Sequence, residues 1–370
     1  MGRYWTYTHS PCKSNPLKVL ITGVCGFVGR WIAESLLESR SGLQLIGIDN
    51  LTRSGSESNR QKLHSMGVHF IHADLRSRSD LDAIPSADWV IDCAAQPSVL
   101  AGTSGHGSSR QLTEHNLIGT LNLLEYCRQH QSGLILLSTS RVYSIDALAS
   151  LPLTAQGDAF ALAPESQLPG GVSEDGIDES FSTTPPVSIY GATKLASETM
   201  AWEYAEAFQF PLRINRCGVL AGAGQFGRAD QGIYAYWVHS HQRRRPLRYI
   251  GFGGSGRQVR DCLHPWDVAQ LIDKQITAAM DSTKPVIANV SGGIESARSL
   301  RQLTQWCNEQ FGNHIVTPSD EERPFDLPWI VLDSRLARNA WQWQPARSTD
   351  QILSEIAEHA RQHPAWLEHS

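Results

Sequence analysis

Two residues with catalytic potential lie four positions apart in the run Tyr190-Gly-Ala-Thr-Lys194. Residues at this spacing share one face of a helix, so the phenol and the ammonium would point the same way. A free tyrosine titrates near pH ~10, and a nearby cation favours the phenolate and lowers that pKa. The pair therefore suits a general base that takes a proton from an alcohol. Many helices carry Tyr and Lys at this spacing by chance, so its meaning depends on the rest of the chain.

A glycine-rich turn follows the first apolar stretch, Lys18–Thr22. Gly23, Gly26 and Gly29 are spaced Gly-x-x-Gly-x-x-Gly, and a helical pattern begins at Phe27. Glycines permit a tight turn and close approach of a pyrophosphate, and the helix N-terminus offers free N–H groups. The alternative is a strand–helix turn without a ligand. The strand–turn–helix context favours a dinucleotide site formed by Gly23, Cys25, Gly26, Phe27, Val28 and Gly29.

Acidic residues follow the next two strand-like runs. Asp49 comes twenty residues after Gly29, where a carboxylate accepts hydrogen bonds from the adenosine ribose and repels a 2′-phosphate. This position favours NAD over NADP, although Arg53 lies close enough in sequence to contact a phosphate. The residues that we expect around the adenosine are Asp49, Asn50, Asp74 and Leu75.

Hydroxyl side chains end another buried run, Leu134–Ser138. The carboxyl end of a central strand faces the ligand crevice in folds built from parallel strands. Thr139 is the first choice for a hydrogen bond to the oxygen that Tyr190 deprotonates, and Ser138 is the second. The alternative is a strand end whose hydroxyls satisfy local backbone groups.

The elements that must position these residues alternate between strand and helix. Short apolar runs separated by helical patterns predict an α/β fold with a doubly wound parallel sheet covered on both faces. The expected strands are Lys18–Thr22, Gln44–Asp49, Val68–His72, Trp89–Cys93, Leu134–Ser138 and Leu212–Cys217. The expected helices are Phe27–Glu38, Gln111–His130, Tyr190–Phe208, Ser299–Phe311 and Thr349–His363.

Three segments are expected along the chain. Residues 1–16 read as a flexible N-terminal extension, and residues 17–217 as a dinucleotide-binding domain. Within that domain the pattern lapses over residues 144–184, a long loop of the kind that is usually functional or disordered. Residues 218–370 are expected to form mainly a smaller α/β substrate lobe, with some segments returning to the first domain.

Composition excludes several classes of protein. The net charge of −5 argues against a nucleic-acid binder, and the run Arg243–Arg245 is interpreted as a solvated surface patch. The seven cysteines form no Cys-x-x-Cys pair, which favours reduced thiols in a cytoplasmic protein. No run is apolar enough to span a membrane. The histidines show no ligand-spaced cluster beyond His239-Ser-His241, so no metal site is expected.

Taken together, these motifs resemble the extended short-chain dehydrogenase/reductase superfamily, whose core is a Rossmann domain. The resemblance runs from about Leu17 to the last helix. It rests on a combination of motifs: Thr22–Gly29, Asp49, Asp74-Leu75, Cys93–Pro97, Asn116, Thr139, Tyr190 with Lys194, and Arg260-Asp261.

Within that superfamily the chain is similar to NAD-dependent nucleotide-sugar epimerases, and most of all to the CDP-paratose 2-epimerase family. Three stretches carry this similarity: Gly176–Ser180, Gly224–Gly232 and Arg257–Asp261. Two stretches depart from the family pattern, residues 147–170 and Arg243–Arg245. Both are expected to border the sugar site, so they bear on which substrate is bound more than on which reaction is catalysed.

The resemblance implies a mechanism. NAD stays bound while Tyr190 removes a proton from a sugar hydroxyl and Thr139 holds the oxygen. Lys194 binds the nicotinamide ribose and lowers the pKa of Tyr190, and Arg260 binds the substrate pyrophosphate. Further cofactor contacts are implied for Ala94, Ala95, Gln96, Asn116, Ser138, Lys194 and Cys217. Further substrate contacts are implied for Pro97, Ser140, Gln225, Asp230 and Gln231.

Relatives of this kind pair through two long helices, so the partners implied are a nucleotide sugar and a second copy of the chain. The helices are Gln111–His130 and Tyr190–Phe208, and the expected assembly is a homodimer or a tetramer.

Other functions remain open. The main alternative is a UDP-sugar 4-epimerase or another nucleotide-sugar oxidoreductase. A 4,6-dehydratase is disfavoured, because Ser140-Arg141 stands where those enzymes carry Asp-Glu. A non-catalytic nucleotide-binding scaffold is the alternative of a different class, and the intact set of Thr139, Tyr190 and Lys194 argues against it.

Overall fold

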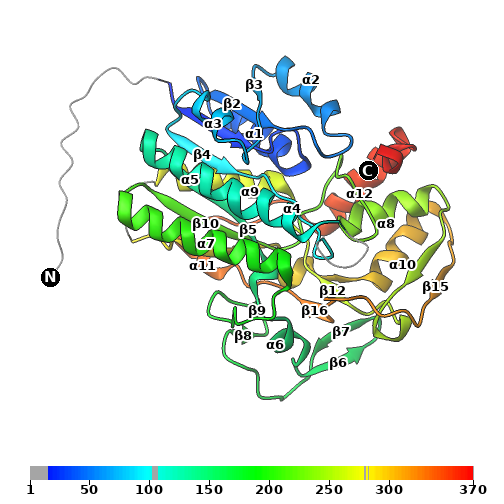
Figure 1. Ribbon diagram of the computed structural model, residues 1–370. Helices are drawn as coiled ribbons and strands as arrows, with labels where there is room; N and C mark the ends of the chain where they lie inside the picture. Colours follow the sequence, from blue (N-terminus) through cyan, green and yellow to red (C-terminus); the bar gives the residue numbers. More distant parts are fainter. Residues whose placement is uncertain (1–15, 102–106, 279–280, 282, 370) are drawn as a thin grey trace.

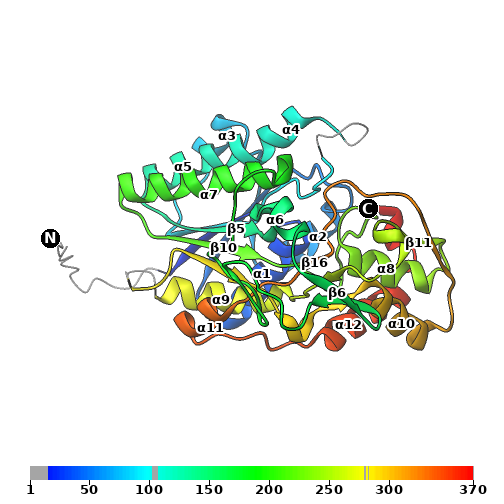
Figure 2. The same ribbon diagram turned by 90° about the horizontal axis from the view of Figure 1, so that it is seen from below.

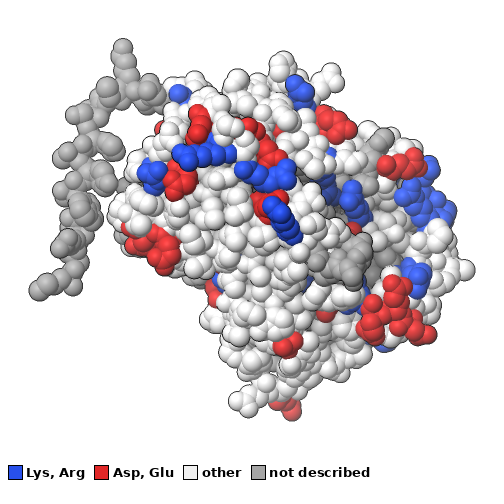
Figure 3. All heavy atoms as spheres, in the orientation of Figure 1, with Lys and Arg blue, Asp and Glu red and all other residues white. Residues whose placement is uncertain are grey.

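The computed structural model describes residues 16–101, 107–278, 281 and 283–369 as a layered α/β molecule (Figure 1). Apart from Pro16, the expected N-terminal extension lies outside the described residues. None of the described helices combines the length and apolar character needed to span a bilayer. On the face seen in Figure 3, basic and acidic side chains are intermingled, so that face has no broad patch of one sign.

A seven-stranded parallel sheet forms the centre of the molecule. Its order is β3-β2-β1-β4-β5-β10-β13, which confirms the predicted doubly wound sheet. The sheet grows from β1 towards β2 and β3 on one side, and from β4 onwards on the other side. Ligands bind at such a switch point, here between β1 and β4. The strands are β1 Lys18–Thr22, β2 Gln44–Asp49, β3 His69–His72, β4 Trp89–Asp92, β5 Gly133–Thr139, β10 Leu212–Cys217 and β13 Ile287–Val290.

Helices cover both faces of this sheet, on opposite sides in Figure 2. Alternate residues of each strand point to opposite faces, so Val19 and Ile21 join one apolar cluster and Leu20 joins the other. One face packs against α1 Phe27–Ser39, α9 Pro265–Thr277 and α11 Arg335–Trp341. The other face packs against α3 Arg78–Asp82, α5 Gly119–His130 and α7 Ser188–Phe208.

The predicted helix Gln111–His130 is interrupted. It consists of α4 Ser109–Thr113, one π-helical turn at Glu114–Ile118, and α5. A single π-turn within an α-helix is a local widening that recurs at functional sites. Here the turn carries Asn116, whose buried side chain reaches the loop after β4.

The C-terminal half is built on three helices that share one apolar cluster: α8 Ile233–Gln242, α10 Leu300–Phe311 and α12 Thr349–Gln362. Ser299 and Ser348 begin α10 and α12 with capping boxes, which satisfy free backbone groups at the helix starts. Short strands complete this half: β11 Leu247–Tyr249 with β15 Val316–Pro318, and β12 Val259–Arg260 with β14 Arg298–Ser299 and β16 Trp329–Ile330.

Residues 144–184 contain regular structure, so the expectation of a patternless loop is wrong. They form α6 Ile145–Ala149, the hairpin of β6 Leu153–Gln156 and β7 Ala159–Leu162, and the hairpin of β8 Val172–Ser173 and β9 Gly176–Ile177. The longer hairpin docks on the C-terminal half: Phe160 N donates to Arg257 O (2.9 Å), and Ser299 Oγ donates to Asp158 O (2.6 Å). It therefore braces the segment that leads into Arg260.

The arginine run at 243–245 has a structural role. Arg244 donates to the backbone carbonyls of Phe311, the last residue of α10, and of Gly312 and Asn313, which follow it. Arg243 and Arg245 pair with Glu368 near the end of the chain, at 3.5 and 3.4 Å. Cations at a helix C-terminus satisfy its free carbonyls. These side chains fasten α10 and the C-terminal turn and are not in the cavity wall, so the expected link with the sugar site is wrong.

Candidate active site

A cavity of about 370 Å³ opens at the carboxyl ends of the central strands. Its wall brings together most of the predicted site residues: Gly23, Gly26, Phe27, Val28, Gly29, Ala95, Pro97, Ser138, Thr139, Ser140, Tyr190, Lys194, Cys217, Gln225, Asp230, Gln231 and Arg260. The predicted residues outside the wall are Cys25, Asp49, Asn50, Asp74, Leu75, Ala94, Gln96 and Asn116. The described residues contain no group of three or more His, Cys, Asp or Glu side chains placed to hold a metal ion.

The glycine turn is compact enough to require its glycines. Gly23 has a φ of 61°, and a Cβ there would lie 2.9 Å from Ala94 Cα. A Cβ on Gly29 would lie 2.3 Å from the carbonyl oxygen of Gly23. The N-terminus of α1 has neither a side-chain cap nor an acidic residue in its first turn. Uncapped N–H groups at a helix start bind diphosphates, so these residues suit a dinucleotide.

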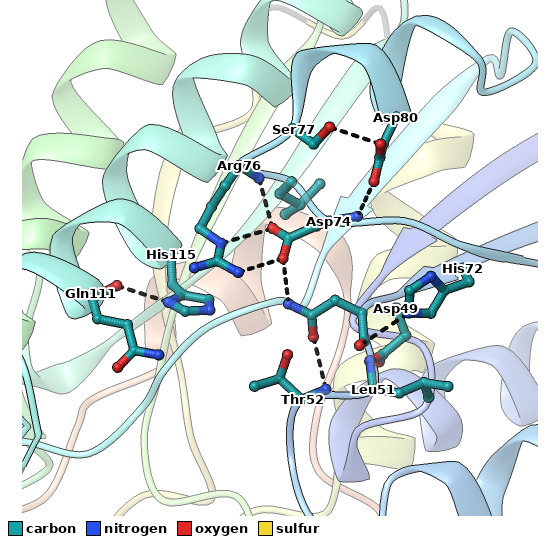
Figure 4. Close-up of polar contacts among 12 residues, drawn as sticks. Asp49, Leu51, Thr52, His72, Asp74, Arg76, Ser77, Asp80, Gln111 and His115 are labelled. Carbon is teal, nitrogen blue, oxygen red and sulfur yellow. Dashed lines mark hydrogen bonds and ion pairs between the residues drawn. The ribbon is translucent and has the colours of Figure 1, made fainter.

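Asp49 holds the glycine turn against β2. Its Oδ2 accepts from Cys25 N (3.0 Å) and its Oδ1 from Leu51 N (2.8 Å), while burial raises its pKa. Figure 4 shows Asp49 beside Leu51 at the end of the strand. Each carboxylate oxygen can accept a second hydrogen bond. The ribose hydroxyls of a dinucleotide are therefore acceptable partners for Asp49.

Asp74 is paired with Arg76, which was not among the predicted site residues. Arg76 approaches it with both Nε (3.0 Å to Oδ1) and Nη2 (2.7 Å to Oδ2), as Figure 4 shows. Asn50 Nδ2 also donates to Asp74, at 3.1 Å. The hydrogen bonds from Arg76 hold the pKa of this carboxyl well below its usual range. Asp74 thus stays ionised and fixed after the end of β3.

The loop after β4 is tied to α7 through Asn116. Asn116 Oδ1 accepts from Gln96 N (2.8 Å), and its Nδ2 donates to Gln96 O and to Thr193 Oγ1, both at 3.2 Å. At the start of the same loop, Ala94 N donates to Thr22 Oγ1 (3.2 Å). These contacts fix the path of the backbone and leave Ala95 and Pro97 in the cavity wall.

A loop spanning residues 225–231, named here the bridging loop, crosses from the C-terminal half to the half that carries the glycine turn. Arg53 donates from Nη1 to Gln231 Oε1 and from Nη2 to Phe226 O, both at 2.8 Å. Ser98 Oγ donates to Asp230 Oδ2 at 2.7 Å. Asp230 and Gln231, both predicted to bind the substrate, therefore fasten this loop to Ser98 and Arg53. Sequence reasoning linked Arg53 to a phosphate, whereas its guanidinium is engaged across the cavity.

Tyr190 lies in the first turn of α7 with its side chain buried. Burial raises its pKa to about 12, opposed by a side-chain hydrogen bond with Thr139 and by the charge of Arg141. Gly191 lets the helix approach this closely, since a Cβ there would lie 2.2 Å from Arg141 O. The phenol and the Thr139 hydroxyl can therefore share one substrate oxygen, as a base and its orienting partner must.

Lys194 is buried one turn further along α7. Its charge lowers the pKa values of the Cys93 and Cys217 thiols, although burial raises both. Lys194 is absent from the principal influences on Tyr190, among which the cation is Arg141. Lys194 therefore lies close to the ends of β4 and β10 as well as on the same helix as Tyr190.

Ser138 points to a buried ion pair behind the sheet. Its hydroxyl donates to Glu198, which pairs with Arg216 at 2.7 Å, and both charged side chains are buried. Glu198 lies one turn after Lys194 on α7. Ser138 therefore helps to anchor α7 to the sheet, and Thr139 is the hydroxyl left beside Tyr190.

A group of arginines lines the cavity beyond Tyr190: Arg141, Arg260 and Arg323. Arg260 Nη2 pairs with Asp326 at 2.7 Å, and burial lowers the pKa values of Arg260 and Arg141. Three cations with one anion suit a diphosphate, for which guanidinium groups have matching donors. Arg141, Arg323 and Asp326 were not among the predicted site residues. No local spacing links them, and only the fold brings them together.

Residues 19–291 match the model of the NAD dependent epimerase/dehydratase family. The chain belongs to this family. The resemblance to NAD-dependent nucleotide-sugar epimerases is confirmed, and the protein is an NAD-dependent enzyme whose glycine turn fits that cofactor.

Relatives match this chain along nearly its whole length. The CDP-paratose 2-epimerase of Salmonella typhi is 30% identical over 340 residues, covering 89% of this chain and 95% of the relative. The UDP-glucuronate 4-epimerase of Thermodesulfobacterium geofontis is 24% identical, covering 90% and 93%. The solved complex of the Thermus thermophilus UDP-glucose 4-epimerase with NAD superposes with a TM-score of 0.72 at 26% identity, covering 93% and 99%.

Proposed function

We propose that this enzyme epimerises the C2 carbon of a CDP-activated sugar through a keto-sugar intermediate. The observation that carries the proposal is the placement of Tyr190. Its phenol lies in one cavity wall with Thr139, the glycine turn and the arginine group, and Thr139 favours its ionised form. The 30% identity to a CDP-paratose 2-epimerase supports the choice of carbon and nucleotide.

The chain's own groups handle the proton. Tyr190 takes the hydroxyl proton of the sugar while Thr139 holds the oxygen, and Tyr190 returns the proton after the keto sugar has turned over. Lys194 binds the nicotinamide ribose. Bound NAD supplies the acceptor, and afterwards the donor, of the hydride at the sugar carbon. No net oxidation results.

Binding roles divide between the two ends of the cavity. The glycine turn, Asp49 and the residues around Asp74 hold the dinucleotide. Arg260 and Arg323 hold the substrate diphosphate. The bridging loop, with Pro97 and Ser140, closes over the sugar. We retain the division into a dinucleotide domain, residues 17–217, and a mainly substrate-binding lobe, residues 218–370, with β13 and α9 returning to the first.

We further propose a homodimer formed through α5 and α7. These helices lie side by side on one face in Figures 1 and 2. Three large apolar side chains on α7 and on the π-turn that leads into α5 are about 40% exposed: Ile118, Trp202 and Phe208. A cytoplasmic location is proposed as well, since six described cysteines are free thiols.

The test combines cofactor release with a substrate screen. Purified protein is denatured and the released nucleotide identified. Native protein is then incubated with CDP-, UDP-, GDP- and dTDP-sugars, and the products are analysed by NMR. We expect released NAD and a C2 epimer of a CDP-sugar without accumulation of NADH. The Tyr190→Phe variant serves as the inactive control.

Other outcomes would replace the proposal. A C4 epimer of a UDP-sugar would establish the 4-epimerase alternative, and stoichiometric NADH would establish a dehydrogenase. Bound nucleotide without turnover of any of these sugars would favour the non-catalytic nucleotide-binding scaffold.

A further inference from the structure

Arg141 is a cavity-lining cation to which no role has yet been given. It lies in a single 3₁₀ turn, Ser140–Val142, directly after β5. Its Nη1 donates to the carbonyl oxygen of Phe325 at 3.0 Å. A guanidinium has five N–H donors, so this bond leaves others for a ligand in the cavity.

The backbone of Arg141 is fixed against both catalytic groups. Its N–H donates to Thr139 Oγ1 at 3.2 Å. Its carbonyl oxygen lies against Gly191, at a distance that leaves no room for a Cβ. The side chain therefore projects from a rigid junction of β5 and α7, next to Tyr190.

The guanidinium of Arg141 also adjoins the cations expected to bind the diphosphate. Phe325, which accepts its hydrogen bond, directly precedes Asp326, the partner of Arg260. Tyr190, Arg260, Arg323 and Asp326 are the charged and titratable groups that act most on Arg141. Arg141 thus bridges the phenol and the diphosphate end of the cavity.

Phe325 reinforces this arrangement. It has a φ of 59°, a left-handed conformation that is costly for a residue with a side chain. Its ring packs against the apolar cluster that contains Tyr190. Phe325 is therefore held against the cluster that contains Tyr190, and the carbonyl oxygen of Phe325 orients the Arg141 guanidinium.

We propose that the Arg141 guanidinium binds the sugar oxygen that Tyr190 deprotonates, and so presents the carbon next to the anomeric carbon to Tyr190. This inference rests on the proposed epimerase function and names a specificity residue for it. In a nucleotide sugar, the C2 hydroxyl adjoins the anomeric carbon that carries the diphosphate, whereas the C4 hydroxyl lies across the ring. A cation that bridges the diphosphate group and Tyr190 matches the first geometry.

The first experiment measures ligand binding to the NAD-loaded enzyme by calorimetry. CDP-glucose is compared with its 2-deoxy and 4-deoxy analogues in wild type, Arg141→Met, Arg141→Lys and Arg78→Met. Arg78 is an exposed control on α3. We expect loss of the 2-hydroxyl to weaken binding to wild type about 10-fold or more, as for a lost charge-assisted hydrogen bond. In Arg141→Met the same analogue should bind as well as CDP-glucose.

The 4-deoxy analogue decides between the two carbons. Arg141→Met should weaken its binding as much as that of CDP-glucose, and Arg141→Lys should retain part of the affinity. If Arg141→Met instead abolishes discrimination against the 4-deoxy analogue, or leaves both analogues unaffected, the inference is overturned. Bound NAD and the unfolding temperature, measured for each variant, separate these effects from a folding defect.

A second experiment does not depend on turnover or on the nucleotide. The phenolate absorbance of Tyr190 is titrated as the difference between each protein and its Tyr190→Phe counterpart. Thr139, Arg141 and Cys217 act on this phenol, and Lys194 lies one turn further along α7 in the same cavity wall. Arg141→Met should raise the pKa of Tyr190, and Arg141→Lys should restore it. An unchanged titration would overturn a role for Arg141 at the phenol, even if no nucleotide sugar is turned over and the proposed function itself fails.

Discussion

At the residue scale, the site depends on one phenol whose environment opposes ionisation. Burial raises the pKa of Tyr190, while Thr139 and Arg141 act in the other direction. The sequence pattern pointed to Lys194 as the tuning cation, because only neighbours along a helix are visible from spacing. Arg141 follows the end of β5, and its backbone can contact α7 only because Gly191 has no side chain.

Tyr190→Phe removes the base without changing the shape of the site. We expect kcat to fall by about 10²- to 10⁴-fold, the usual contribution of a positioned acid or base. Bound NAD should stay at the wild-type level, because the phenol is not in the glycine turn. Turnover assays and cofactor quantification check this. Near-wild-type kcat would remove Tyr190 from the mechanism.

Asp49→Asn keeps the shape of the side chain and removes its charge. We expect the Kd for NAD to rise by about 10-fold or more, because a charge-assisted hydrogen bond to the ribose is weakened. The Kd for NADP should change less, so discrimination between the two narrows. Titration of apoenzyme with each cofactor measures both values. Equal affinities in variant and wild type would mean that Asp49 serves only the backbone of Cys25 and Leu51.

At the element scale, prediction succeeded where a pattern is local. The strands β1, β2 and β10 begin and end as expected, because β1 and β2 have apolar centres and β10 alternates apolar and polar residues. The helices α8 and α9 and strand β13 were missed, since their residues are mixed and only tertiary packing decides them. The glycine turn and Tyr190 were identified from spacing, whereas Arg323 and Asp326 reach the cavity from a distant segment.

The contact between α8 and α12 should make stability depend on pH. His239 and His359 face each other across it at 3.3 Å, and burial lowers their pKa values to about 3 and about 4. An unfolded histidine titrates near pH ~6.5, so below that value the unfolded chain binds more protons. The stabilising effect of the neutral pair is therefore complete above pH ~6.5 and declines as the pH falls towards 4.

Thermal unfolding of wild type and His359→Gln between pH 7.5 and 5 tests this. We expect the unfolding temperature of wild type to fall with pH, and the variant to show a shallower slope because one of the two groups no longer titrates. Parallel slopes would show that other groups cause the acid sensitivity.

At the scale of the whole molecule, the exposed face of α5 and α7 is the proposed dimer interface. Trp202→Glu places a charge among its apolar side chains, and burying an unpaired charge is unfavourable. We expect this variant to sediment as a monomer at concentrations where wild type is a dimer. Ile315→Glu is the matched control, because Ile315 is 82% exposed outside these helices. A wild-type monomer, or a dimer in the Trp202 variant, would contradict the proposed interface.

The bridging loop has a consequence for how long the enzyme retains its cofactor. Arg53 and Ser98 fasten the loop that we propose closes over the sugar. We expect release of NAD to require opening of this loop, whereas a catalytic cycle leaves the cofactor as it began. We expect each molecule to keep the NAD that it acquired at folding. Its turnover rate should then not depend on the cellular ratio of NAD to NADH.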